Sequence, residues 1–510
     1  MFIPFGEWLP DLPAHMNPGA TVAKNCVPRT ASAGSGTSYG PLQSLTPYSG
    51  ALAQRCQGAF AGRSKTGQVT NLAGDATRLY KLTDTTWTDV SKAGGYSIAT
   101  DETWRFCQFG ERVLATDLAE PIQSWTLDSS SQFADLAATA PKARHIASID
   151  PGFVMVGNTS DPTDGGVPNR VWWSALEDPA TWPTPGTAAA AAVQSDRQDL
   201  PTGGWVQAVI GAVGGARGAV LMDSAIYRVE YEGPPTVFGF YEVERARGTP
   251  APGSVINVGP FAFYLGEDGF YAFDGSRSIP IGANKVDKTF YSELDQQYFH
   301  RISVAVDPVN KLVFWAYPAA GHAGGNPNRL LVYNWEAGRW AMAEQDLELV
   351  ARLLSRSYSL DGLDAVSASL DALPFSLDSR VWTGGRILLG AFDSTHRLGY
   401  FDGAAMAATI ETGEFGGSPA VGDAGGAARR LFVSGIRPIV DGGSVTALLR
   451  HRGAPDGVLT DSPATSPGAD GACPQRIAAR YVRAQVAVAA SGSWSHARGI
   501  EAAAGPEGLR

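Results

Sequence analysis

Residues 330–342 read LLVYNWEAGRWAM, two apolar runs on either side of the turn-forming stretch Glu336-Ala337-Gly338. Short runs rich in aliphatic and aromatic residues, joined by a few residues that include glycine, are typical of a β-hairpin. The same shape recurs at 78–90, which reads RLYKLTDTTWTDV, and at 261–273, where the stretch from Gly266 to Gly269 separates two aromatic runs. These stretches predict a chain built from short antiparallel strands.

Similar strand-like runs recur between about residue 50 and residue 400, at 112–116, 152–156, 170–173, 219–222, 225–231, 302–306 and 311–317. Divergent strand-turn-strand repeats favour a β-propeller, whose four-stranded blades surround a channel. Blade periods of ~40–50 residues would place about six to eight blades here. A β-sandwich or a pair of barrels is the alternative. Only two stretches, 286–298 and 344–355, favour a helix.

The chain divides into three regions. Residues 1–50 are rich in proline and lack periodicity, which predicts an extended N-terminal arm. Residues 51–400 form the propeller-like body with a platform insertion, and alternation returns in residues 401–510, which predicts a C-terminal β module. The arm carries large apolar side chains that need burial, so we expect it to lie on the rest of the chain or on a neighbour: Phe2, Phe5, Trp8 and Leu12.

The composition supports an all-β reading and argues against tight binding to DNA. Charged residues make up 18% of the 510 residues, below the average of about 25%. There are 60 glycines and 33 prolines for turns, and the aromatic fraction of 10% argues against disorder. The net charge of −10 is opposite to what a protein needs to neutralise phosphates.

The four cysteines and the N-terminus indicate where the protein works. Cys26, Cys56, Cys107 and Cys473 form no C-x-x-C pair, so we expect buried thiols in a reducing compartment rather than disulfides or zinc. The first residues have no basic region with a long apolar core, so we expect no signal peptide. No apolar run is long enough to cross a membrane.

Sequence patterns that often carry chemistry are weak here. Residues 36–40 match the G-x-S-x-G pattern of hydrolases, but Pro41 and the small residues before it supply neither the strand nor the helix of that motif. The glycine-rich stretch 211–218 misses the dinucleotide-binding spacing and reads as a hairpin turn. The seven histidines are isolated, with no zinc-binding spacing.

Acidic residues give no stronger signal. Asp361, Asp364, Asp371 and Asp378 lack the spacing of an EF-hand and read as turns. The pair Glu267-Asp268 could serve a glycosidase, but no two acids stand in environments that would separate their pKa values. We therefore expect no enzyme, no metal site and no cofactor.

Arginines gather in the C-terminal module. They form either a surface that faces DNA or an interface in which arginine pairs with acids of a neighbouring subunit, and the overall negative charge favours the interface. Together with the apolar arm, they supply our candidate interface residues: Phe5, Trp8, Leu12, Arg437, Arg480 and Arg483.

Three ordered groups of residues resemble the tail nozzle proteins of short-tailed bacteriophages, a family that includes the packaged-DNA stabilisation and tail tubular B proteins. The first group lies in the arm and comprises 5–13 (FGEWLPDLP), 17–19 (NPG), 23–28 (AKNCVP) and 39–42 (YGPL). The second is Val171-Trp172-Trp173-Ser174 with Asp178-Pro179 and Trp182. The third is 374–379 (PFSLDS) with Phe392-Asp393 and His396-Arg397-Leu398.

The resemblance implies a propeller with an added platform of strands and no catalytic residue. It further implies a hexameric ring in the virion tail, assembled in the host cytoplasm below the portal and adaptor proteins and in contact with distal tail proteins. Double-stranded DNA would pass through the ring without tight or sequence-specific binding, since an acidic wall repels phosphates.

We therefore expect a structural virion protein that forms the distal channel for genome retention and ejection. The alternative is a propeller module that binds glycans or receptors on a cell surface. A ring-forming subunit needs two different faces, and the arm and the arginine-rich module are the candidates for them.

Overall fold

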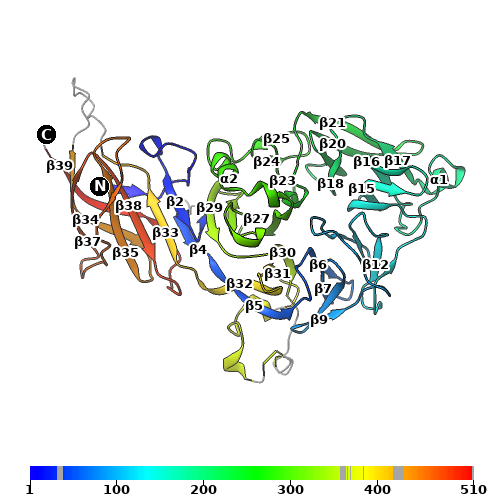
Figure 1. Cartoon of the computed structure of the whole chain (residues 1–510), viewed down its shortest axis with the longest axis horizontal. Coiled ribbons are helices and arrows are strands. Elements are labelled where there is room, and N and C mark those ends of the chain that lie inside the picture. The colour runs from blue at the N-terminus through cyan, green and yellow to red at the C-terminus, as the bar shows by residue number, and fades with distance from the viewer. Residues whose placement is uncertain are drawn as a thin grey trace.

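The computed structural model describes residues 1–30, 38–355, 363, 366–367, 369–382, 384–416 and 430–507. The molecule is elongated, with a ring of small sheets at one end and a strand module at the other (Figure 1). Both termini lie in the module, although most of the intervening chain forms the ring. The protein is thus an all-β structure in which the two ends of the sequence are brought together.

The ring is a β-propeller of seven blades in the described residues. Six blades are separate four-stranded sheets. The remaining blade, which precedes the last one in chain order, consists of the four strands at one end of a nine-stranded sheet. The innermost strands of the blades are β6 (Gly58–Arg63), β10 (Arg105–Phe109), β14 (Lys142–Ile149), β18 (Val206–Ile210), β22 (Ile256–Val258), β26 (Ser303–Asp307) and β30 (Leu349–Leu354).

The remaining strands of each blade follow outward by antiparallel pairing. In chain order they are β7 (Val69–Gly74), β8 (Leu79–Thr83), β9 (Thr86–Asp89), β11 (Arg112–Thr116), β12 (Gln123–Thr126), β13 (Ala134–Asp135), β15 (Phe153–Asp161), β16 (Gly165–Trp173), β17 (Asp196–Asp199), β19 (Gly218–Met222), β20 (Ala225–Gly233), β21 (Val237–Arg245), β23 (Phe261–Leu265), β24 (Phe270–Phe273), β25 (Ser278–Pro280), β27 (Leu312–Tyr317), β28 (Arg329–Asn334), β29 (Arg339–Glu344), β31 (Ile387–Phe392) and β32 (Arg397–Ala405). The hairpins predicted at 78–90, 261–273 and 330–342 are confirmed as β8–β9, β23–β24 and β28–β29.

An N-terminal strand closes the propeller. Strand β5 (Gln43–Ala51) pairs with β32 as the outer strand of the last blade, with Leu45 opposite Phe401 and Thr46 opposite Tyr400. The first and last blades are then held side by side through contacts between β6 and β30. The end of the region predicted as an arm is therefore part of the propeller itself.

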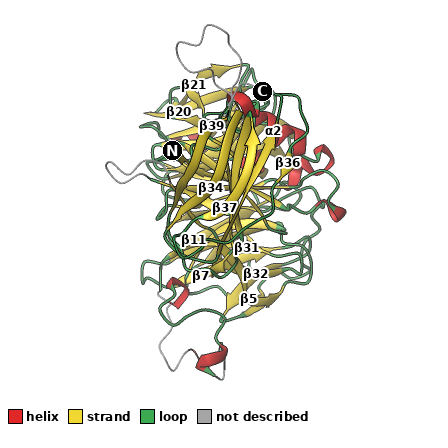
Figure 2. Cartoon of the chain, turned by 90° about the vertical axis from the view of Figure 1, so that its left-hand side faces the viewer, coloured by secondary structure: helices red, strands yellow, loops and turns green. Residues whose placement is uncertain are grey.

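The module is built from strands of both chain ends, arranged in two sheets. One sheet continues outward from β29 through β2 (Ala20–Lys24), β33 (Ala408–Thr412), β38 (Tyr481–Val488), β35 (Val445–Arg452) and β36 (Thr460–Asp461). The other contains β3 (Cys26–Arg29), β4 (Ser38–Pro41), β39 (Ala497–Glu507), β34 (Arg430–Val440) and β37 (Cys473–Ala479), with β1 (Phe2–Pro4) on β39. Figure 2 shows β39, β34 and β37 side by side on the end of the molecule.

A single buried core runs from the module into the neighbouring blade. It joins Val433 and Ile436 of β34 and Val486 of β38 to Trp315 of β27 and Trp340 of β29. Each of these side chains is almost fully buried. Because burying a large apolar side chain contributes about 1.5–3 kcal/mol, this shared core ties the module to the propeller.

Helices are short, and one predicted helix is wrong. The stretch 286–298 contains α2 (Asp287–Glu293), followed by the 3-10 turn Gln296–Arg301, and α1 (Ala188–Val193) is a single alanine-rich segment. The stretch 344–355 is not a helix, because residues 349–354 form β30 between β26 and β6. A short apolar run is ambiguous between helix and buried strand, and here long-range pairing selects the strand.

Candidate functional site

The junction between propeller and module is formed by the N-terminal segment of the chain. We define it as residues 5–29, which run between β29 of the propeller and β33 of the module. Strand β2 pairs with both, with Lys24 opposite Met342 on one side and Thr409 on the other. The sheet is therefore continuous from one part to the other, which makes the molecule one unit.

Asn25 connects the two parts through its side chain. It has a left-handed backbone conformation (φ 57°) that asparagine tolerates well. Its Nδ2 donates to the carbonyl of Ala407 at 3.0 Å, and its Oδ1 accepts from the amide of Glu344 at 3.0 Å. One side chain thereby satisfies a backbone group at the end of β29 and another just before β33.

Asn17 and Gly19 fix the turn that precedes β2. The Oδ1 of Asn17 accepts from the amide of Gly19 at 2.8 Å, and its Nδ2 donates to the carbonyl of Leu9 at 2.9 Å. A Cβ atom on Gly19 would lie 1.9 Å from the carbonyl oxygen of Glu7, so only glycine fits. The sequence pattern Asn-Pro-Gly marks a turn, but it does not reveal the strand against which the turn lies.

The apolar candidate interface residues lie at this junction, inside the chain. Phe5 is fully buried and Trp8 is 3% exposed, and both belong to the shared core. The Trp8 Nε1 donates to the carbonyl of Thr21 at 3.2 Å. Leu12 is partly buried. Phe5 and Trp8 are therefore not available as interface side chains in this fold, which corrects that expectation for these two residues.

Arg483 is also engaged inside the chain. Arg483 forms ion pairs with Glu411 at 3.3 Å and with Glu414 at 3.0 Å. The side chains of both glutamates are only 1% exposed. Arg452 donates to Glu414 at 2.9 Å, and Arg450 forms an ion pair with Glu411 at 3.1 Å. The expectation that these arginines pair with acids of a neighbour is corrected for Arg483, whose acidic partners lie in its own chain.

The two remaining candidates lie at the surface of the module. Arg437 forms an exposed ion pair with Glu501 at 3.0 Å, beside a shallow groove of about 680 Å³ that Met1 and Phe2 also line. Arg480 is exposed and lines a smaller hollow with His451. Of the named arginines, these two are accessible to a partner.

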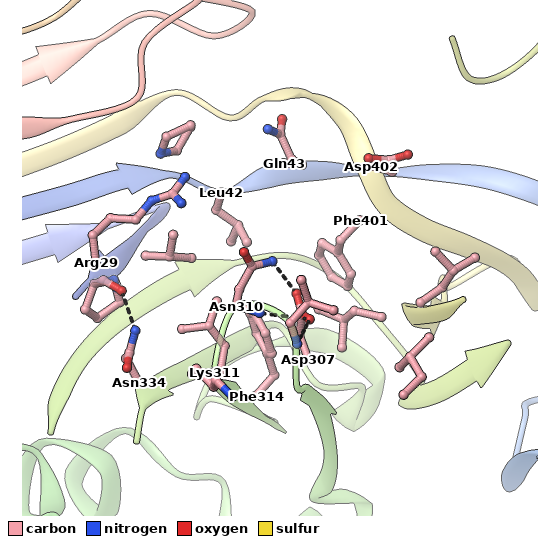
Figure 3. A pocket seen from close by; sticks show the side chains of 18 of the residues that line it. Arg29, Leu42, Gln43, Asp307, Asn310, Lys311, Phe314, Asn334, Phe401 and Asp402 are labelled. Atoms are coloured by element: carbon pink, nitrogen blue, oxygen red, sulfur yellow. Dashed lines mark hydrogen bonds between the residues drawn. The ribbon is translucent and has the colours of Figure 1, made fainter. Parts of the chain in front are cut away.

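A pocket of about 420 Å³ lies where the junction crosses the propeller. Figure 3 shows Arg29, Lys311, Asp307 and Asp402 around it, with Asn334 reaching toward the crossing strand. The Nδ2 of Asn334 donates to the carbonyl of Pro28 at 2.9 Å. Charged residues of both signs line this pocket, which lies between the junction and the propeller.

The serine of the hydrolase-like pattern lies on a strand. The preceding residues of the pattern lie outside the described residues, and Ser38 begins β4. Its Oγ lies 3.3 Å from Nδ1 of His496, but Asp441 accepts from the backbone amide of His496 and not from its ring. A strand position lacks the sharp strand-to-helix turn that exposes such a serine.

The structure also places the glycine-rich stretch and the cysteines that the sequence analysis considered. The glycine-rich stretch 211–218 is the turn between β18 and β19, as predicted. Across the part of the chain that the structure describes, no cluster of three or more metal-ligating side chains occurs. Asp361 and Asp364 lie outside the described residues. All four cysteines are free and buried, and burial raises the pKa of the Cys107 thiol to about 12.

Sequence reasoning missed the residues that hold the junction together. Glu411 and Glu414 gave no signal, because a buried acid and a solvated one look alike in a sequence. Asp11 belongs to the motif at 5–13, which does not indicate that its carboxylate binds helix α2. The arginines that gather in the module are a sequence signal for these acids, because a buried carboxylate needs a cationic partner.

No family model matches the sequence, and no curated protein matches it. Among solved structures, the extracellular domain of BT4673 from B. thetaiotaomicron is similar with a TM-score of 0.40 and 11% identity, over 85% of this chain and 48% of that chain. This chain thus spans about half the length of BT4673 as solved.

Two further solved structures are matched over nearly their whole length. The WD40 propeller domain of Doa1 has a TM-score of 0.39 and 11% identity, over 71% of this chain and 96% of that one. YCF48 bound to a D1 peptide has a TM-score of 0.35 and 9% identity, over 71% and 97%. At these TM-scores the similarities carry no conclusion about function. Separately, none of the helices among the described residues has the length and apolar character needed to cross a membrane.

Proposed function

We propose that this chain is a structural subunit of the tail nozzle of a short-tailed bacteriophage, which assembles into a hexameric ring around the path of the DNA. The observation that carries the proposal is the role of the motif residues in the arm. Asn17, Gly19 and Asn25 belong to the first group of residues that carries the family resemblance. Asn25 joins the propeller to the module, and Asn17 and Gly19 fix the turn that leads into the connecting strand β2. Residues with purely architectural roles suit a protein whose function depends on its shape.

The charge distribution agrees with this function. The net charge is −10, and three of the module's arginines (Arg450, Arg452 and Arg483) are taken up by Glu411 and Glu414. A subunit with a net negative charge lets DNA move past, whereas a basic surface would retain it through its phosphates. In this proposal the virion tail is the site of action, the portal, adaptor and distal tail proteins are partners, and no reaction is catalysed.

The proposal is tested by assembly of the purified full chain, followed by mass photometry and negative-stain microscopy with and without the neighbouring tail proteins. We expect closed hexameric rings with a central opening. Arg480→Glu, at an exposed candidate of the module, should weaken ring formation, whereas Arg217→Glu, on an exposed propeller turn, should not. A chain that stays monomeric under all these conditions would contradict the proposal.

The alternative is a propeller module that binds glycans or receptors, and the open cavity at the centre of the propeller favours it. The two functions differ in stoichiometry and ligand. A receptor-binding module should bind host envelope glycans while remaining a monomer or trimer, whereas a nozzle subunit should form rings without a glycan.

A further inference from the structure

The centre of the propeller contains a cavity of about 370 Å³, a size typical of small-ligand sites. Inner strands of five blades line it, namely β6, β10, β22, β26 and β30. Apolar side chains such as Ala59, Ala61 and Val304 and polar ones such as Gln57 and Asn257 both contribute to the lining. Among the described residues that line it, only two carry a charge, Arg105 and Arg352, and both are cations.

These two arginines lie on the inner strands that flank β6. Arg105 begins β10, and Arg352 is in the middle of β30. In the described part of the chain, neither guanidinium forms an ion pair or a hydrogen bond with another residue. Burial lowers the pKa of Arg105 to about 10 and also lowers the pKa of Arg352. Arg105 is partly buried and Arg352 is exposed, so a solute in the cavity can reach both side chains.

The acidic residues around these two arginines neutralise them only in part. The acid nearest to Arg105 in electrostatic terms is Glu102, which is already in contact with Arg144. His145 is buried, and burial followed by the charges of Arg105 and Arg144 holds its pKa well below the usual range. His145 is therefore neutral, and the region retains an excess of positive charge.

We propose that the central cavity of the propeller binds a small oxyanion, a phosphate or carboxylate group, through Arg105 and Arg352. The partly buried guanidinium of Arg105 has no ion pair, and an oxyanion supplies both the opposite charge and acceptors that match the planar donors of an arginine. Charge-assisted hydrogen bonds of this kind are stronger than neutral ones. The inference goes beyond the proposed ring, which needs no ligand inside each propeller.

The test is isothermal titration calorimetry of the full chain with inorganic phosphate and, separately, with citrate, at low ionic strength and neutral pH. The two probes distinguish a preference for phosphate from one for carboxylate. We expect saturable binding of at least one probe by the native chain. Arg105→Gln and Arg352→Gln should each weaken that binding about tenfold, because each removes hydrogen bonds to a charged group.

Arg217→Gln is the matched control, because it removes one positive charge from an exposed turn away from the cavity. It should bind the probe as the native chain does. Circular dichroism verifies that each variant is folded, and Arg105→Lys and Arg352→Lys replace any glutamine variant that fails to fold. The proposal is overturned if the native chain binds neither probe up to about 10 mM, a millimolar-scale limit. Equal weakening in Arg217→Gln would overturn it as well.

Discussion

The carboxylate of Asp11 binds the start of helix α2 through Thr289, a residue 278 positions later in the chain. Its Oδ1 accepts from both the backbone amide and the hydroxyl of Thr289 at 2.8 Å. Its Oδ2 accepts from the amide of Lys288 at 2.9 Å. Because the first amides of a helix have no partner within the helix, a carboxylate from elsewhere can cap them. The N-terminal segment is thus fastened to the propeller by a helix cap.

Replacement of Asp11 by alanine should lower the free energy of unfolding by about 1–2 kcal/mol, the usual cost of losing such a cap. The reason is that two backbone amides of α2 and one hydroxyl lose their acceptor together. Urea denaturation followed by tryptophan fluorescence measures the change. Asp456→Ala, at an exposed position of the module, serves as control and should change the stability by much less. Equal stability of the native chain and Asp11→Ala would contradict the capping role.

The buried acids of the module should matter far more than its exposed ion pair. Glu414→Gln leaves Arg452 without a charged partner and leaves Arg483 with Glu411 alone, at a site where the glutamate side chain is 1% exposed. Breaking a buried ion pair from one side costs about 3–5 kcal/mol. The exposed pair between Arg437 and Glu501 supplies the control, since Glu501→Gln should cost no more than about 1 kcal/mol.

Denaturation of the two variants under the same conditions measures this difference. We expect a much lower transition midpoint for Glu414→Gln than for Glu501→Gln. Similar midpoints would mean that the Glu411–Glu414 cluster is hydrated in solution and adds little to the stability of the module.

Asp287 should make the protein less stable as the pH rises. Burial raises the pKa of its carboxyl to about 7, and nearby Asp11 and Asp268 act in the same direction. The folded state therefore holds a proton that the unfolded state releases at an ordinary carboxyl pKa near 4. The stabilisation is fully present below about pH 4 and is lost progressively as the pH rises toward about 7.

Asp287→Asn removes this titration while keeping an oxygen for the amide of Phe270, which Oδ1 now binds at 3.1 Å. We expect the stability of the variant, relative to the native chain, to increase between about pH 4 and pH 8 by up to a few kcal/mol. Urea denaturation across this pH range measures it. A constant difference between the two proteins would show that Asp287 does not titrate there.

Local sequence patterns predicted many of the strands, but they did not predict which distant strands pair with one another. The hairpin at 330–342 could be predicted because its strands, its glycine and its turn are neighbours in the sequence. The helix predicted at 344–355 failed because strand β30 is specified by contacts with β26 and β6 rather than by its own periodicity. The Glu411–Arg483 pair is likewise formed by residues that are distant in sequence, and a sequence does not show which arginine is buried.

The closure of the propeller by β5 makes the N-terminal segment necessary for folding. A surface arm could be removed without harm, but residues 43–51 form a blade strand, and Phe5 and Trp8 belong to the shared core. A chain that lacks residues 1–51 should therefore lose its cooperative unfolding transition, because the last blade loses its outer strand and the core loses two aromatic side chains.

The matched control lacks only residues 1–4, which removes β1 from the edge of β39 and leaves the junction and β5 intact. It should fold cooperatively with a modest loss of stability. Circular dichroism during thermal denaturation compares the two truncations. If the chain without residues 1–51 still unfolds in one sharp transition near the native temperature, β5 is dispensable and the propeller is closed by contacts between its first and last inner strands alone. Residues 1–51 would then be a surface arm that folding does not require, and ring assembly would be the property to compare between the two truncations.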